Sequence, residues 1–237
     1  MCIRDSVAGD LVFPGPTAEY VPGHSLEVWR RLAAANAVLV QGVSDKALVA
    51  LDADSVVATS EHEKSMLARV REVRKELGDL VIERLRRLPT HARVPLEDGG
   101  ELVLVHGSPA DPGEPITHDL DDEDVNALLG ADPADIVVCG MSHVPFTREL
   151  GDVKIVNVGS VGEAPDGAVD GPGGKKRPRV AHATWIESTP AGTPARSAST
   201  AIGCATSQLV TRSWVLRVSS SPKGSPPVSS SNSTVPR

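Results

Sequence analysis

The sequence predicts a layered α/β fold, in which short buried strands alternate with helices. Short apolar runs bounded by glycine are typical of strands buried on both faces, and segments with helical spacing of apolar residues separate these runs. The chain has 237 residues, of which 40% are hydrophobic, so it is long enough for one domain with a sizeable core. Aromatic residues make up only 3%, and the core must therefore consist mainly of Val, Leu, Ile and Ala.

The predicted elements follow one another along the chain. Apolar runs predict the strands, which are expected at residues 38–41, 101–105, 136–139, 154–158 and 179–186. Helical spacing predicts the helices, which are expected at residues 25–36, from 61 to 77, at 79–88 and around 121–129. Ser60 and Glu63 have the spacing of a capping box, which starts the second of these helices, and Pro89 ends the third.

Composition divides the chain into three parts. Residues 1–6 are expected to be foreign to the domain or unstructured, because Gly9-Asp10 already resembles the exit of a strand that almost nothing precedes. Residues 7–186 carry all the predicted elements and form the domain. Residues 187–237 are rich in Ser, Thr, Pro, Gly and Ala, and this composition predicts a disordered tail.

Charge and composition disfavour several classes of partner. The formal net charge is −7, so we expect no nucleic-acid scaffold role. No apolar run approaches the roughly 20 residues of a membrane span, and no secretory signal is visible, which predicts a cytoplasmic protein without membrane partners. The three cysteines are far apart and form no C-x-x-C pair, as expected in a reducing compartment. Nothing in the sequence indicates the oligomeric state.

Polar and histidine side chains follow the predicted strands where each strand ends. Asp10 and Asp45 follow the first two glycine-bounded runs, and His106 and His143 follow two later ones. Sites in layered α/β proteins assemble from loops at the carboxyl ends of buried strands. The sequence therefore predicts one site built from these four side chains.

Taken in order, these segments resemble the motifs of the calcineurin-like metallophosphoesterases, and most closely those of their small bacterial and archaeal phosphodiesterase branch. The resemblance covers residues 7–186. The corresponding family motifs are Gly-Asp, Gly-Asn-His-Asp or -Glu, His-Gly, Gly-His-Thr-His and Asn-Pro-Gly-Ser-Val-Gly. The matching segments here are Gly9-Asp10, Gly42-Val43-Ser44-Asp45, His106-Gly107, Gly140-Met141-Ser142-His143 and Asn157-Val158-Gly159-Ser160-Val161-Gly162.

The resemblance implies a layered β-sandwich flanked by helices and the hydrolysis of a small phosphorylated substrate. In such a reaction two divalent metal ions hold the phosphate and activate the attacking water. By resemblance, Asp10 bridges the metals, His106 binds the second metal and His143 binds the first. Asp45 and Ser44 occupy catalytic positions, since Ser44 stands where the family has the histidine that protonates the leaving group.

Backbone N–H groups of Gly107 and Ser108 are candidates for a phosphate cradle, and a simple turn is the alternative for this segment. Two other positions depart from the family pattern. Val43 replaces the ligand asparagine and Met141 replaces a ligand histidine, and both changes remove ligands of the second metal.

The family's opening Asp-x-His motif has no counterpart before Asp10, so the first strand and helix of the fold are expected to be missing. The chain is therefore interpreted as an N-terminally truncated member with degenerate metal motifs, which binds at most one divalent ion of Mn, Fe or Zn. Two alternatives remain open at this point. One is a catalytically degenerate member that serves as a binding or scaffold module, and the other is an inactive fragment.

Overall fold

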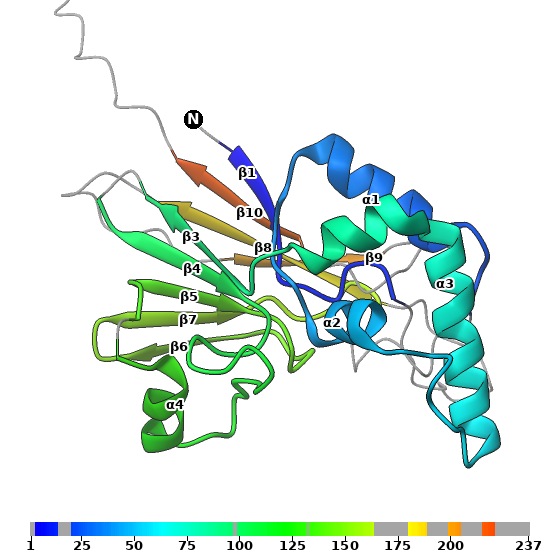
Figure 1. Ribbon diagram of the computed structural model, residues 1–237. Helices are drawn as coiled ribbons and strands as arrows, with labels where there is room; N and C mark the ends of the chain where they lie inside the picture. The colour runs from blue at the N-terminus through cyan, green and yellow to red at the C-terminus, as the bar shows by residue number, and fades with distance from the viewer. Residues whose placement is uncertain are drawn as a thin grey trace, which may run out of the picture.

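Two five-stranded sheets form the framework of the computed structural model (Figure 1). The structure describes residues 3–13, 20–96, 99–131, 133–163, 180–188, 199–204 and 215–220. Residues from both sheets and from three helices belong to one cluster of buried hydrophobic side chains. The predicted layered α/β architecture is thus confirmed.

The first sheet has the strand order β2-β1-β10-β8-β9. Its strands are β1 (Ile3–Val7), β2 (Val38–Leu39), β8 (Val180–Ser188), β9 (Ser199–Cys204) and β10 (Val215–Ser220). Strand β1 runs parallel to β2 on one side and antiparallel to β10 on the other. Because β1 and β2 are parallel, their carboxyl ends meet at one edge, where Asp10 and Gly42 follow them.

The second sheet has the strand order β3-β4-β5-β7-β6. Its strands are β3 (His91–Pro95), β4 (Glu101–Val105), β5 (Ile136–Cys139), β6 (Phe146–Leu150) and β7 (Val153–Asn157). The three central strands are parallel, and the two outer strands pair antiparallel with them. The segments after β4, β5 and β7, which begin at His106, Gly140 and Val158, therefore share one end of this sheet.

Four helices accompany the sheets in the described residues. They are α1 (His24–Ala35), α2 (Val43–Ala50), α3 (Glu61–Arg86) and α4 (Asp122–Leu129). Figure 1 shows α1, α2 and α3 grouped beyond one end of the strands, whereas α4 lies near β6. The capping box of α3 is confirmed, since the Glu63 N–H donates to Ser60 Oγ at 3.2 Å. Gly78 leaves helical geometry (φ 72°, ψ 164°) and divides α3 into the two predicted helical pieces.

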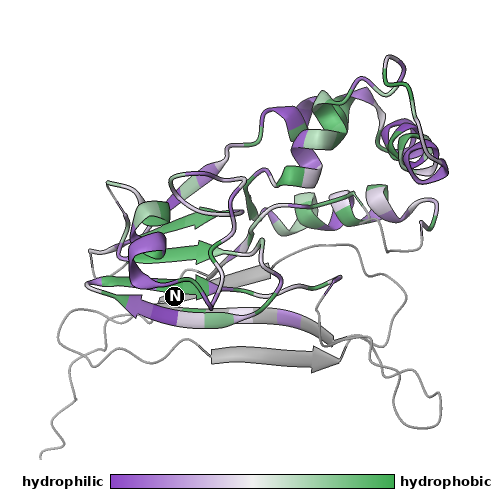
Figure 2. Ribbon diagram, turned by 90° about the horizontal axis from the view of Figure 1, so that it is seen from below, coloured by the Kyte–Doolittle hydropathy of each residue, from purple (hydrophilic) through white to green (hydrophobic). Residues whose placement is uncertain are grey.

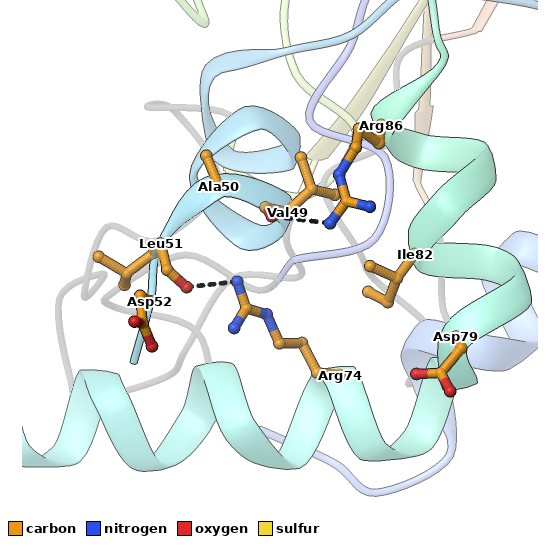
Figure 3. Close-up of a pocket in the computed structure, with 8 residues that line it drawn as sticks. All are labelled: Val49, Ala50, Leu51, Asp52, Arg74, Asp79, Ile82 and Arg86. Atoms are coloured by element: carbon orange, nitrogen blue, oxygen red, sulfur yellow. Dashed lines mark hydrogen bonds between the residues drawn. The ribbon is translucent and has the colours of Figure 1, made fainter. Parts of the chain in front are cut away.

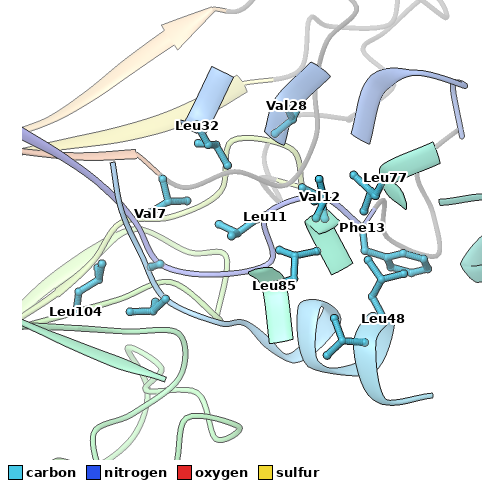
Figure 4. Packing of buried hydrophobic residues seen from close by; sticks show 14 of the residues in the cluster. Val7, Leu11, Val12, Phe13, Val28, Leu32, Leu48, Leu77, Leu85 and Leu104 are labelled. Carbon is cyan, nitrogen blue, oxygen red and sulfur yellow. The ribbon is translucent and has the colours of Figure 1, made fainter. Parts of the chain in front are cut away.

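The hydrophobic core lies between the sheets and the three grouped helices. Figure 4 shows Leu11 and Val7 facing Leu85 of α3 and Leu48 of α2 across this region, and none of these four side chains is more than 1% exposed. The hydropathy view shows the central strands of the second sheet as mainly hydrophobic and α3 as mixed (Figure 2). Within the described ranges, no helix combines the length and apolar character that crossing a bilayer requires.

The structure differs from the sequence prediction at both ends of the chain. Residues 3–6, expected in a foreign or unstructured start, lie in β1, which pairs with β2 on one side and with β10 on the other. Residues 199–204 and 215–220, expected in a disordered tail, form β9 and β10. Pairing with β1 and β8 supplies the backbone hydrogen bonds that composition alone does not reveal.

Three further elements were not predicted. Strand β6 lies at a sheet edge with alternately half-buried and exposed residues, and β3 at the opposite edge has only one buried residue, so neither contains a continuous apolar run. Helix α2 begins directly after Gly42, in a motif segment for which no helix was predicted.

Candidate functional site

Two predicted site residues have an unusual backbone conformation. Among the described residues other than glycine, positive φ occurs at Asp10 (54°), Asn36 (50°) and His143 (65°). Asn36 is the C-cap of α1, a position at which this conformation is common. At Asp10 and His143 no helix end explains it. Left-handed backbone in a residue with a side chain is strained, and such strain gathers at functional sites.

The exits of β1 and β2 touch at Gly9 and Gly42. A Cβ atom on Gly42 would lie 2.2 Å from the backbone nitrogen of Asp10 and 2.3 Å from its Oδ1. A Cβ atom on Gly9, where φ is 84°, would lie 2.8 Å from His106 Nδ1. Glycine is therefore needed at both positions for the two strand exits and the imidazole to come together.

His106 is buried and held in one orientation. Its Nδ1 lies 2.6 Å from the carbonyl oxygen of Ala8, and because a carbonyl can only accept, Nδ1 carries the proton. The other ring nitrogen, Nε2, lies 3.6 Å from Asp10 Oδ2. The two side chains are only 1% and 6% exposed. A histidine whose Nδ1–H is bound to a carbonyl, with Nε2 directed at a carboxylate, has the arrangement that metal-binding histidines adopt.

The N-terminus of α2 contacts the same carboxylate. The Ser44 N–H donates to Asp10 Oδ1 at 2.7 Å, and the Ser44 hydroxyl donates to Oδ2 at 3.0 Å. The Asp45 carboxylate accepts from the N–H groups of Leu11 (2.9 Å) and Gly42 (3.0 Å). Burial, and after it the negative charge of Asp10, raises the pKa of Asp45 from 3.8 to about 7, against the opposing effect of these backbone donors.

His143 belongs to a second group of contacts at the exits of β5 and β7. Its Nδ1 lies 3.2 Å from the carbonyl oxygen of Glu163 and 3.9 Å from the Oε2 of the same residue. Asn157 Nδ2 donates to Ser142 Oγ at 2.9 Å, and Asn157 Oδ1 accepts from the Gly159 N–H at 3.1 Å. These bonds support the loop that carries His143.

The four predicted side chains do not all enter one donor cluster. In the part of the chain that the structure describes, no group of three or more His, Cys, Asp or Glu side chains could hold a metal ion. Asp10 and His106 are brought together, Asp45 lies beside them, and His143 lies against Glu163. Sequence reasoning missed Glu163, for which no motif gave a signal, whereas Asn157 stood within a quoted motif and received no role.

The remaining sequence candidates have clear positions. Val43 is 41% exposed at the first turn of α2, and Met141 is half-buried. Neither side chain contains oxygen or nitrogen, so neither can replace a ligand of a hard metal ion. The Gly107 N–H donates to the Pro112 carbonyl and the Ser108 N–H donates to the Asp111 carbonyl, both at 3.1 Å. These two bonds close a turn, and the role of Gly107 and Ser108 in binding a phosphate stays a prediction.

A cavity of about 370 Å³ lies at the other end of α2 and contains none of the predicted site residues. Its lining comes from the last turn of α2 and from α3 (Figure 3). Arg74 donates to the carbonyl oxygens of Leu48 and Leu51, and Arg86 donates to that of Val49. The two arginines thus neutralise the C-terminal end of the helix whose N-terminal end contacts Asp10.

A family model described as the calcineurin-like phosphoesterase superfamily domain matches residues 7–171. The chain belongs to this family. The fold and the family predicted from the sequence are therefore confirmed. Membership supports a general phosphoesterase function, and the family generally binds divalent metals.

Solved structures agree with the assignment of the fold. The chain is similar to the metallophosphoesterase from Sphaerobacter thermophilus, with a TM-score of 0.51 and 16% identity over 91% of this chain and 88% of that one. It is also similar to the hypothetical protein PH1004 from Pyrococcus horikoshii OT3, with a TM-score of 0.50 and 20% identity over 66% of this chain. The match spans 63% of the Pyrococcus protein. A comparison with curated protein sequences finds no match.

Asp10 and His106 are of the residue types that ligate divalent cations, and they are the predicted ligands that the structure brings together. Nε2 of His106 and Oδ2 of Asp10 face each other at 3.6 Å, and both side chains are buried. Imidazole and carboxylate are the donors of the family's usual ions.

Proposed function

We propose that this chain hydrolyses small phosphate esters at the pair formed by Asp10 and His106, with one divalent cation. The observation that carries the proposal is the pair of buried side chains whose Asp10 Oδ2 and His106 Nε2 face each other at 3.6 Å, at a strand exit with left-handed backbone. The Ala8 carbonyl fixes the proton on Nδ1 of His106 and so keeps Nε2 directed at Asp10. This pair would hold the cation.

The charges around the pair support a requirement for a cation. Asp10 acts as a negative charge on its neighbour Asp45, and a phosphate that approached Asp10 without a cation would meet repulsion. When bound, a divalent cation supplies neutralising charge and lowers the pKa of a water molecule so that it can attack phosphorus. Asp10 and His106 orient that cation, and burial of both side chains strengthens their electrostatic attraction to it.

The small number of protein donors favours Mn²⁺ over Zn²⁺ among the ions expected for the family. Catalytic zinc usually takes three protein ligands, whereas only two donors face each other here. Hard cations of the Mg²⁺ type retain several waters and accept phosphate oxygens as ligands, so one or two protein side chains are enough. The substrate is expected to be a small phosphorylated molecule, whose own oxygens complete the coordination.

The proposal is tested by hydrolysis of p-nitrophenyl phosphate and bis-p-nitrophenyl phosphate with Mn²⁺, Fe²⁺ or Zn²⁺. Activity is expected with Mn²⁺ and should disappear with EDTA. Asp10→Asn and His106→Ala should each lower kcat/KM at least about 100-fold, because each removes one of two donors. His62→Ala is the matched control, since His62 is exposed on α3, and it should retain full activity. Activity that survives EDTA or Asp10→Asn would contradict the proposal.

A non-catalytic binding role is the second candidate function. The observation in its favour is that Val43 and Met141, whose side chains carry no oxygen or nitrogen, stand at two ligand positions of the family, and that no group of three or more possible ligands occurs among the described residues. For this role we expect a wild-type protein without hydrolytic activity, whose melting temperature is unchanged by Mn²⁺. The same purified protein therefore distinguishes the two functions.

A further inference from the structure

We propose that Ser44 is a positioning residue that holds the Asp10 carboxylate in the orientation needed for the cation. The proposal rests on the proposed function, because the cation itself is part of that function. It assigns Ser44 a role different from that of the family's histidine at this position. The observation behind it is that two donors of one residue bind the two oxygens of one carboxylate.

The two hydrogen bonds fix the rotation of the carboxylate. Ser44 lies in the first turn of α2, where backbone N–H groups lack partners within the helix, and Asp10 Oδ1 accepts this N–H at 2.7 Å. The hydroxyl bond to Oδ2 at 3.0 Å adds a second point of attachment. A carboxylate has about four lone-pair positions, so these bonds leave capacity on Oδ2 toward His106.

The helix that carries Ser44 is itself fixed at both ends. Asp45 accepts the N–H groups of Leu11 and Gly42, which ties the first turn of α2 to the loop that contains Asp10. At the other end, Arg74 donates to the Leu48 carbonyl at 2.7 Å. Ser44 therefore cannot move away from Asp10 without breaking contacts to two other segments, and this rigidity is what a positioning residue needs.

The alternative role for Ser44 is proton donation to the leaving group, as the family's histidine would perform. The Ser44 hydroxyl proton is directed at Asp10 Oδ2 and not toward open solvent. A serine hydroxyl also has no pKa near neutrality, which a general acid requires. The geometry therefore supports positioning of Asp10 over direct participation in the reaction.

The test compares Ser44→Ala, Ser44→Thr and a control, Ser55→Ala. Ser55 also donates its hydroxyl to a nearby oxygen, the Asp52 carbonyl, and it is exposed outside the site. Isothermal titration of the metal-free chain with Mn²⁺ should show affinity about 10- to 100-fold weaker for Ser44→Ala, as for other residues that orient metal ligands. Ser44→Thr keeps a hydroxyl and should bind within about threefold of wild type, and Ser55→Ala should be unchanged.

A second measurement needs no metal. In EDTA, Ser44→Ala should lower the melting temperature by roughly 3–8 °C, since it removes a hydrogen bond to a buried carboxylate, and Ser44→Thr should restore most of this loss. Equal melting temperatures for Ser44→Ala and Ser55→Ala would overturn the proposal even if wild type binds no Mn²⁺. A wild-type protein that binds no Mn²⁺ would by itself refute the proposed function. The proposal for Ser44 would also be overturned if Ser44→Ala kept its Mn²⁺ affinity and had a lower kcat, because Ser44 would then act on the substrate.

Discussion

The region around Asp10 and the region around His143 share a backbone conformation but differ in how far their side chains are buried. Both follow a buried strand, and both contain a predicted ligand with left-handed backbone. In the Asp10 region, Ser44 contacts Asp10 and His106 contacts Ala8, and both contacts join residues far apart in sequence. The side chains of Asp10 and His106 are nearly inaccessible to solvent. The His143 region is held by Glu163, 20 residues away, and the His143 side chain is 25% exposed. Strain therefore marks both strand exits, but only the Asp10 region buries its predicted ligands almost completely.

The largest expected effect that separates the two regions is the pH dependence of stability. In the Asp10 region, Asp45 has a pKa of about 7 in the folded state and about 3.8 when unfolded. Between these values the native chain holds a proton that the unfolded chain releases, so this group makes the free energy of unfolding decrease as pH rises. The expected slope is up to about 1.4 kcal/mol per pH unit.

Urea denaturation between pH 4 and pH 8 measures this slope. Asp45→Asn should flatten the curve in this window, whereas Asp54→Asn, which changes an exposed carboxylate, should leave it as in wild type. A wild-type curve that rises with pH and an Asp45→Asn curve parallel to it would contradict the expected pKa.

A larger residue at Gly42 should clash with the Asp10 backbone and destabilise the protein. Gly42→Ala places a methyl group 2.2 Å from the Asp10 nitrogen, and neither backbone can yield without losing the Ser44 contacts. We expect a loss of about 3 kcal/mol in the free energy of unfolding, measured by urea denaturation. Gly113→Ala is the control, since its methyl group would meet only the flexible Asp111 carboxylate at 3.3 Å and should cost less than about 0.5 kcal/mol. Equal losses would show that the close contact is not present in solution.

Replacing each histidine in turn compares the two regions directly. His106→Ala leaves the buried Ala8 carbonyl without its donor and opens space in the interior, which should cost about 2–3 kcal/mol. His143→Ala removes a partly exposed ring and should cost less than about 1 kcal/mol. Both values come from denaturation in EDTA, so bound metal does not contribute. The reverse order of the two losses would contradict the comparison.

The smallest expected effect concerns the remote support of α2. Arg74→Ala leaves two carbonyl groups at the end of α2 without their guanidinium donor and should cost about 1 kcal/mol. Arg31→Ala removes a surface ion pair with Glu27 and should cost less than about 0.5 kcal/mol. Thermal unfolding by circular dichroism measures both. Identical melting curves for the two variants would show that Arg74 does not support the helix.

The sequence predicted those features that local patterns determine. Strands β4 and β5 begin and end where the apolar runs do, and the start of α3 follows from Ser60 and Glu63. Edge strands such as β6 were not predicted, because one of their faces is partly solvated and no continuous apolar run results. Helix α2 was not predicted, because its first residues were assigned to a family motif and their capping geometry was not considered.

The candidate site was predictable in its residues but not in its connections. Glycine-bounded strand exits pointed to Asp10 and His106, and the structure places them 3.6 Å apart, although their roles as metal ligands stay predictions. The bonds from Ser44 to Asp10 depend on the angle at which α2 meets the exit of β1, which no short segment encodes. The contact of His143 with Glu163 depends likewise on the path of the chain after β7.

The pairing of β1 with β10 has a consequence for how the chain is made. Ser6 lies opposite Leu216, so the strand that leads to Asp10 gains one of its two neighbours only after residues 215–220 have left the ribosome. Contacts between residues so distant in sequence form late and slowly. Until then, one edge of the nascent β1 offers unpaired backbone groups to other chains. Synthesis that stops before residue 215 would therefore release a product that aggregates, even though every residue of the candidate site has already been translated.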